Sequence, residues 1–282
     1  MGDKFEIKIK GHEKFVLREG WLTKGLLAVR NNPRTFSEDN GPDILGVGSN
    51  MVKAIRYYLQ AFDLVNESIK NGTTLNDIGL LIVQNDPYIE DYFTLCLLHS
   101  RIAKNERRAT TWYLFFNQNE LIEFSKADLQ NYIRREIYAR YGKEVPESSI
   151  KDDVDVMLNM YEKNDINTDP EDKMNSPFSS LQLIGKEKDT YIKQQPDMKK
   201  IGVDTVLYEV ASLIQGQNSI NIENISEHLE NIFNIPWVQT NEMLDILDRE
   251  EIIRVDRTAG LDVIYPIVVP TPEEVIENHY RR

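Results

Sequence analysis

The sequence of 282 residues contains a single cysteine and only four histidines. Cys96 has no second cysteine to pair with, so no internal disulfide can form. The histidines and Cys96 show none of the spacings at which zinc ligands occur. These shortages exclude both a disulfide framework and a structural zinc site.

Long apolar stretches are also missing from the sequence. No segment approaches the roughly 20 apolar residues that a membrane-spanning helix needs. Residues 1–6 lack the apolar core of a signal peptide, so we expect a cytoplasmic protein with no membrane partner. The segment 46–50 has neither the lysine nor the spacing of a phosphate-binding loop, so we expect no nucleotide cofactor.

The charge of the chain is strongly acidic and unevenly distributed. The net charge is −13, yet residues 1–150 carry no net charge and residues 151–282 carry the whole excess. A neutral region can hold a local basic surface for nucleic acid, whereas a strongly acidic one repels DNA and suits protein partners. The length and the 41% apolar content are typical of two globular domains with different tasks.

The N-terminal region has the pattern of a winged-helix domain. Residues 5–10 alternate apolar with charged side chains, which predicts a strand. Helical spacing predicts helices over 17–29, 37–45 and 50–64, and Lys70-Asn71-Gly72 predicts a hairpin turn after them. In proteins of this order the helix after the turn enters the DNA major groove. A small helical domain without a ligand is the alternative interpretation.

The third of these helices would carry the DNA contacts. An apolar stripe of Met51, Ile55, Tyr58, Leu59 and Phe62 should face the core. The predicted DNA-binding residues on the other side and at the start of the helix are Ser49, Asn50, Lys53, Arg56, Tyr57 and Gln60.

The remainder of the sequence predicts a helical middle and a second winged-helix-like unit. Helical patterns cover 88–103, 110–116 and 126–141, and the polar, proline-containing segment 164–199 is typical of a linker or exposed excursion. Residues 203–264 repeat the order of helix, strand, two helices and hairpin. Because its last helix carries Glu242, Asp245 and Asp248, this unit should contact protein rather than DNA.

These patterns together predict a mainly α fold with small β-hairpins. The expected divisions are an N-terminal winged-helix DNA-binding domain with a helical extension over 1–163, a linker or excursion over 164–199, and an acidic winged-helix-like interaction domain over 200–282.

Four segments resemble a bacterial family catalogued as a domain of unknown function. They are residues 11–25, 45–58, 86–99 and 110–117, which include Gly11-His12-Glu13-Lys14-Phe15, Leu45-Gly46-Val47-Gly48-Ser49, Asp86-Pro87-Tyr88 and Thr110-Thr111-Trp112. Members of that family accompany genes for DNA phosphorothioation, in which sulfur replaces a backbone oxygen. One of them resembles the DNA-nicking component of the single-strand phosphorothioation (Ssp) system. The resemblance therefore implies DNA as a partner, together with other phosphorothioation proteins bound through the acidic half.

The chain departs from the family pattern at two positions. A lysine usually stands where this sequence has Ser49, and a tryptophan usually stands where it has Cys96. The loss of the lysine would remove one phosphate contact, although the Ser49 hydroxyl can donate a hydrogen bond to a phosphate or cap the helix.

Strand nicking would require a base, phosphate-binding cations and, in most nucleases, a divalent metal ion such as Mg²⁺ or Mn²⁺. We predict His12 and Glu13 as catalytic residues, with Arg18 and Lys24 binding the phosphate. His12 and Glu13 alternatively anchor the chain and cap a helix. Glu90, Asp91 and His99 are a weaker acidic candidate, because Asp91 and His99 would lie roughly 12 Å apart along one helix.

Two functions follow from these patterns. The first is a DNA-binding component of a bacterial phosphorothioation and defence system, and whether this component is also the strand-nicking enzyme stays open. The alternative is a non-catalytic winged-helix transcription regulator or adaptor. The sequence does not identify metal ligands for either function.

Overall fold

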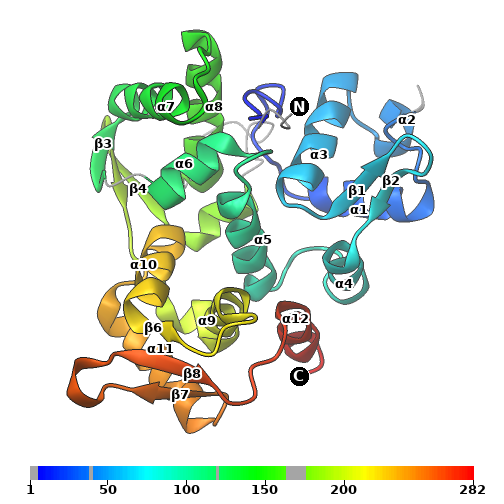
Figure 1. The fold of residues 1–282 in the computed structure, drawn as a ribbon. Helices are drawn as coiled ribbons and strands as arrows, with labels where there is room; N and C mark the ends of the chain where they lie inside the picture. The colour runs from blue at the N-terminus through cyan, green and yellow to red at the C-terminus, as the bar shows by residue number, and fades with distance from the viewer. Residues whose placement is uncertain (1–5, 38–40, 119–120, 163–175) are drawn as a thin grey trace.

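The structure, a computed structural model, describes residues 6–37, 41–118, 121–162 and 176–282. In these ranges the chain forms twelve α-helices, two short 3-10 helices and three small antiparallel sheets. Figure 1 shows an N-terminal group of helices on one side of α5 (Tyr92–Lys104), a second group above it on the other side and a C-terminal group below. The predicted mainly helical fold with small hairpins is confirmed.

The N-terminal group contains three helices, a hairpin and a fourth helix. The bounds are α1 (Trp21–Asn31), α2 (Gly41–Leu45), α3 (Ser49–Ala61), β1 (Val65–Ser68), β2 (Gly72–Leu75) and α4 (Asp77–Asn85). The apolar stripe of α3 is buried as predicted, with Ile55, Tyr58 and Leu59 fully enclosed against α1 and its neighbours. The second helix is described over Gly41–Leu45, inside the predicted range, and residues 38–40 lie outside the described part.

The hairpin is fixed to the turn that follows α1. Gly72 has a φ of +71°, and a Cβ at this position would lie 2.4 Å from the carbonyl oxygen of Pro33. Thr73 donates its backbone N–H to the same oxygen over 2.8 Å. Only glycine permits both this backbone conformation and this close approach, so the hairpin keeps one position beside α3.

The strand predicted over residues 5–10 is wrong for its described part, because residues 6–10 do not pair with any strand. Their backbone donors are satisfied by side chains instead. Lys8 donates its N–H to the Thr110 hydroxyl over 3.2 Å, and Lys10 donates its N–H to Asp153 over 2.6 Å. The alternating pattern therefore reflects a segment packed between two groups of helices.

The middle group packs helices against a three-stranded sheet. The elements are α6 (Thr110–Gln118), β3 (Glu123–Ser125), α7 (Lys126–Tyr141), α8 (Glu147–Tyr161), the 3-10 helix η1 (Pro177–Leu181), β4 (Ile184–Glu187) and β5 (Thr190–Lys193). Ser125 caps α7 through a reciprocal pair of contacts with Asp128, which confirms the predicted start of this helix. Within the predicted linker, Phe178 and Leu181 are fully buried, so this part of 164–199 is folded.

The C-terminal group follows the predicted order of elements. It contains α9 (Met198–Ile214), β6 (Ile220–Asn221), α10 (Ile222–Phe233), α11 (Trp237–Arg249), β7 (Ile253–Asp256), the 3-10 helix η2 (Thr258–Gly260), β8 (Val263–Pro266) and α12 (Pro272–Tyr280). The strands form one sheet in the order β6-β8-β7. Helix α9 bends at Gly202, whose φ is +69°.

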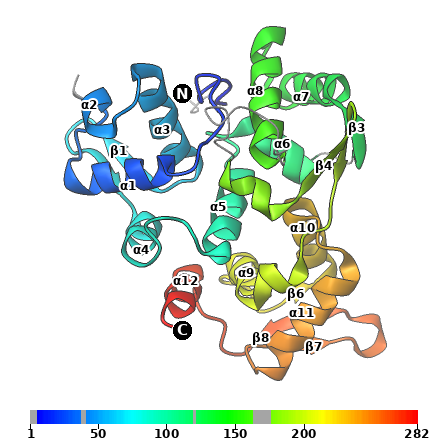
Figure 2. The same cartoon turned by 180° about the vertical axis from the view of Figure 1, so that it is seen from behind.

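The last described helix joins the C-terminal group to the N-terminal group. Helix α12 packs on both α9 and α4, and Figure 2 shows it from behind beside these helices. The buried apolar side chains of all three groups belong to one continuous core. Among the described helices, none combines the length and the apolar character needed to cross a membrane.

Candidate nucleic-acid interface

The start of α3 presents a polar, cationic surface. Ser49, Asn50 and Lys53 are all exposed there. The Lys53 ammonium lies 3.4 Å from Asn50 Oδ1, so the two side chains project together. Their exposure agrees with the face predicted to contact DNA.

The backbone at the start of α3 adds to this positive character. The N-cap residue is Gly48, and no side chain caps the first turn. The initial N–H groups of an uncapped helix attract anions, because they combine unpaired donors with the positive end of the helix dipole. Lys24 is also exposed, and its ammonium donates to the carbonyl of Leu45 over 3.2 Å, shortly before α3 begins.

Arg56 lies farther along the same helix and is held by the hairpin. Its Nε and Nη2 donate to the two oxygens of Glu67 over 2.8 and 2.9 Å. The hydrogen bonds from Arg56 to Glu67 raise the pKa of the guanidinium. Partial burial acts to raise the pKa of Glu67, but the hydrogen bonds from Arg56 keep the pKa of this carboxyl below its ordinary value. A phosphate would have to compete with Glu67 for Arg56.

Tyr57 and Gln60 do not lie on the exposed face that we predicted for them. Tyr57 is only 4% exposed, because the N-terminal segment covers it and its ring meets the His12 ring edge-on at 5.9 Å. Gln60 is half-buried near the end of α3. The prediction that Tyr57 contacts DNA is therefore corrected, since its side chain is enclosed by protein.

His12 is fully buried and uses both of its ring nitrogens. Nδ1 accepts the backbone N–H of Lys14 over 3.1 Å, which places the ring proton on Nε2. Nε2 in turn donates to Asp153 Oδ1 over 2.8 Å. In this arrangement His12 has no free nitrogen that could accept a proton from a substrate.

Asp153 collects hydrogen bonds from three parts of the chain. Besides His12, it accepts the backbone N–H of Lys10 and the hydroxyl of Thr111, the latter over 2.8 Å. Only 1% of Asp153 is exposed. The N-terminal segment, α6 and α8 are thus joined at one buried carboxyl group, which sequence reasoning did not single out.

The other predicted catalytic residues occupy different surroundings. Glu13 is exposed and adopts a left-handed backbone conformation, with a φ of +51°. The guanidinium of Arg18 lies 5.5 Å from the centre of the Trp21 ring, a cation–π distance. Lys24 lies near α2. The side chains of His12, Glu13 and Arg18 form no hydrogen bond or ion pair with one another or with a common partner among the described residues, so they do not form a reaction centre.

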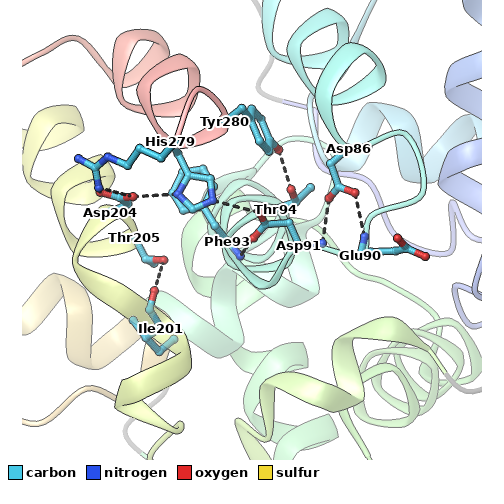
Figure 3. A network of polar contacts seen from close by, with 11 residues as sticks. Asp86, Glu90, Asp91, Phe93, Thr94, Ile201, Asp204, Thr205, His279 and Tyr280 are labelled. Carbon is cyan, nitrogen blue, oxygen red and sulfur yellow. Dashed lines mark hydrogen bonds and ion pairs between the residues drawn. The ribbon is translucent and has the colours of Figure 1, made fainter.

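A network of acidic residues and a histidine joins α5 to the last helix (Figure 3). His279 Nε2 lies 3.1 Å from Asp91 Oδ2, and its Nδ1 lies 2.8 Å from Asp204 Oδ2. The hydrogen bond to Asp204 raises the pKa of His279, and the same bond lowers the pKa of Asp204. Arg282 also reaches Asp204, over 3.1 Å. A protonated His279 therefore bridges two carboxylates.

The weaker acidic candidate, Glu90, Asp91 and His99, lies among structural contacts. Asp86 accepts the backbone N–H groups of Glu90 and Asp91, over 2.9 and 3.1 Å. Asp91 also caps α5 by accepting from Phe93. His99 is fully buried between the hydroxyl of Tyr161 and a backbone carbonyl, and this burial lowers its pKa to about 4. His99 is therefore neutral near pH 7.

The match to known sequences covers nearly the whole chain. A family profile with the description "Protein of unknown function (DUF4007)" matches residues 9–280. The chain belongs to the DUF4007 family. The family predicted from the sequence motifs is thus confirmed, while no curated protein matches the chain.

Two solved structures are similar to this DUF4007 protein. One is a magnesium-ion-bound SspB crystal structure, with 23% identity and a TM-score of 0.88. The other is an SspB crystal structure, with 24% identity and a TM-score of 0.87. Each comparison covers 97% of this chain and 88% of the SspB chain. The likeness establishes a shared fold.

A divalent-metal centre made by protein ligands alone does not fit the described residues of this DUF4007 chain. Within 6–37, 41–118, 121–162 and 176–282, no three His, Cys, Asp or Glu side chains are grouped so as to hold an ion. The group of side chains that most resembles a metal site consists of His279, Asp91 and Asp204. His279 already forms ion pairs with both of these carboxylates.

The first prediction concerns the buried carboxyl that joins three segments. Asp153→Ala should lower the free energy of unfolding by about 3–5 kcal/mol, because it leaves several buried donors without an acceptor. Asp155→Ala is the matched control on the same helix. Its half-exposed pair with Lys126 should contribute only about 0–1 kcal/mol. Urea denaturation of both variants measures the difference, and equal losses would contradict this role of Asp153.

The second prediction is a pH dependence of stability from His279. Because the folded state raises its pKa, the stabilisation is fully present below the unfolded value near 6.5 and is lost as pH rises through the folded pKa. His279→Gln should therefore be less stable than wild type by about 1 kcal/mol at pH 6, and this gap should shrink by pH 9. Glu277→Gln, on the same helix, is the control. A gap that stays constant with pH would contradict the protonated bridge.

Proposed function

We propose that this protein is a DNA-binding component of a bacterial DNA phosphorothioation system. The observation that carries the proposal is the surface at the start of α3, where Lys53, Asn50 and Ser49 are exposed beside an uncapped helix end. This surface lies in the half of the chain that has no net charge. Cations and unpaired N–H donors are the groups that bind the phosphate backbone of DNA.

The arrangement of the N-terminal group supports a winged-helix interpretation. Helices α1 to α3 pack together, and the β1–β2 hairpin follows α3 directly. In this interpretation α3 is the recognition helix and the hairpin is the wing. The family membership and the fold shared with SspB support the phosphorothioation context.

The C-terminal group has a similar order of elements but an acidic surface. On α11, the helix that corresponds to α3, Glu242 and Asp245 are exposed. These carboxylates would repel phosphates, so we assign this unit to contacts with other proteins of the system. The two units then divide the work between DNA and partner proteins.

The proposal has two alternatives: a DNA-binding protein that also nicks one strand, and a non-catalytic adaptor. The engagement of both His12 nitrogens favours the adaptor in the free protein. Supercoiled plasmid incubated with the protein and Mg²⁺ or Mn²⁺ discriminates between the two, because only a nickase produces open circles. If open circles form with wild type but not with Glu13→Gln, the adaptor version is wrong.

The third prediction tests the DNA-binding surface directly. Lys53→Ala should weaken binding to a short duplex and reduce the salt slope of log K by about 0.9, the value for one lost phosphate contact. Lys151→Ala removes the same charge from an exposed position on α8 and should leave the slope unchanged. Fluorescence anisotropy over a range of salt concentrations measures both. An equal slope for wild type and Lys53→Ala would exclude α3 as the contacting helix.

A further inference from the structure

Basic residues gather around the first strand of the hairpin, on the side away from the start of α3. One pocket of about 480 Å³ is lined there by Arg101, Lys104, Arg107 and Arg108, together with Asp63 and Glu67. A neighbouring pocket of about 630 Å³ shares Glu67 and adds Arg34 and Arg56. Six cations therefore face two carboxylates in a chain whose net charge is −13.

Arg101, Arg56 and Lys104 are held in place by close partners. Arg101 donates to the backbone oxygen and to the carboxylate of Asp63, and Arg56 is held by Glu67. Lys104 lies 2.9 Å from the fully buried Glu209. Burial acts to raise the pKa of Glu209, but the charge of Lys104 and a hydrogen bond from His228 hold it at about 2. These pairs fix the framework of the surface. The side chains of Arg34, Arg107 and Arg108 are exposed on it.

The turn that carries Arg107 and Arg108 is fastened to the end of α3. Asn105 donates to the carbonyl oxygens of Gln60 and Ala61, over 3.2 and 2.9 Å. Arg101 donates to the carbonyl oxygen of Phe62 over 2.9 Å. These contacts satisfy carbonyls that the helix end leaves unpaired, so the turn keeps a fixed position relative to α3.

The length of α3 allows both of its ends to reach DNA phosphates. Its 13 residues span roughly 20 Å, whereas the major groove of B-DNA is about 12 Å wide. A helix lying across the groove with Lys53 near one phosphate strand brings its other end toward the opposite strand. The α5–α6 turn stands at that other end.

We propose that the α5–α6 turn, through Arg107 and Arg108, is a second site that binds the phosphate backbone of DNA. It rests on the proposed function, because it assumes that α3 faces DNA. The middle group of helices then takes part in DNA binding, and the interface extends beyond the winged-helix unit.

The test compares two pairs of adjacent, exposed arginines. Arg107→Gln/Arg108→Gln should reduce the salt slope of log K for a 20-base-pair duplex by about 1.8, or 0.9 for each phosphate contact. Arg134→Gln/Arg135→Gln on α7 changes the net charge equally and should leave the slope unchanged. Arg107→Lys/Arg108→Lys should keep most of the wild-type slope, because lysine retains the charge. Melting temperatures show whether each variant remains folded.

The possible outcomes separate this inference from the proposed function. If Lys53→Ala reduces the slope but the Arg107/Arg108 variant does not, only the second site is wrong. If the α7 control variant and the α5–α6 variant reduce the salt slope equally, the effect is one of general charge, and the second site is also wrong. If wild type does not bind the duplex at low salt, the proposed function itself fails.

Discussion

The position of α3 relative to the helical middle depends on the hydrogen bonds to Asp153. This carboxyl group holds His12 and Lys10, and the same N-terminal segment accepts a hydrogen bond from Tyr58 of α3 at the carbonyl of Phe15. Three of the four segments that carry the family resemblance meet here, around His12, Tyr57 and Trp112. The residues of these segments thus form one buried, packed centre in this chain.

Much of the architecture could be predicted from periodicity and turn residues. Helix α7 begins and ends where its pattern and the Ser125 cap indicated, and the C-terminal elements lie close to the predicted ranges. Helix α8 was not predicted, and its charged run Lys151-Asp152-Asp153 contains a buried residue, Asp153. The pattern shows which residues are charged, but it does not show which of them will find partners inside the fold.

The candidate site was predicted less completely than the fold. The exposure of Lys53 and Asn50 follows from the apolar stripe of α3, whereas the burial of Tyr57 depends on a segment more than 40 residues earlier that covers one side of the helix. The cluster around β1 combines residues from four separate segments. His279 and its carboxylate partners are likewise distant in sequence. Such groupings are set by tertiary packing and leave no local spacing to detect.

The packing of α12 affects the order in which the chain folds during its synthesis. His279 and Tyr280 contact Asp91 and Thr94, across 188 and 186 positions of sequence. His279 and Tyr280 emerge from the ribosome after the other described elements, so the earlier groups can assemble before these contacts form. Closure of this very long loop is therefore a late event in folding. A variant without α12 would lack these contacts and the packing of α12 on α4.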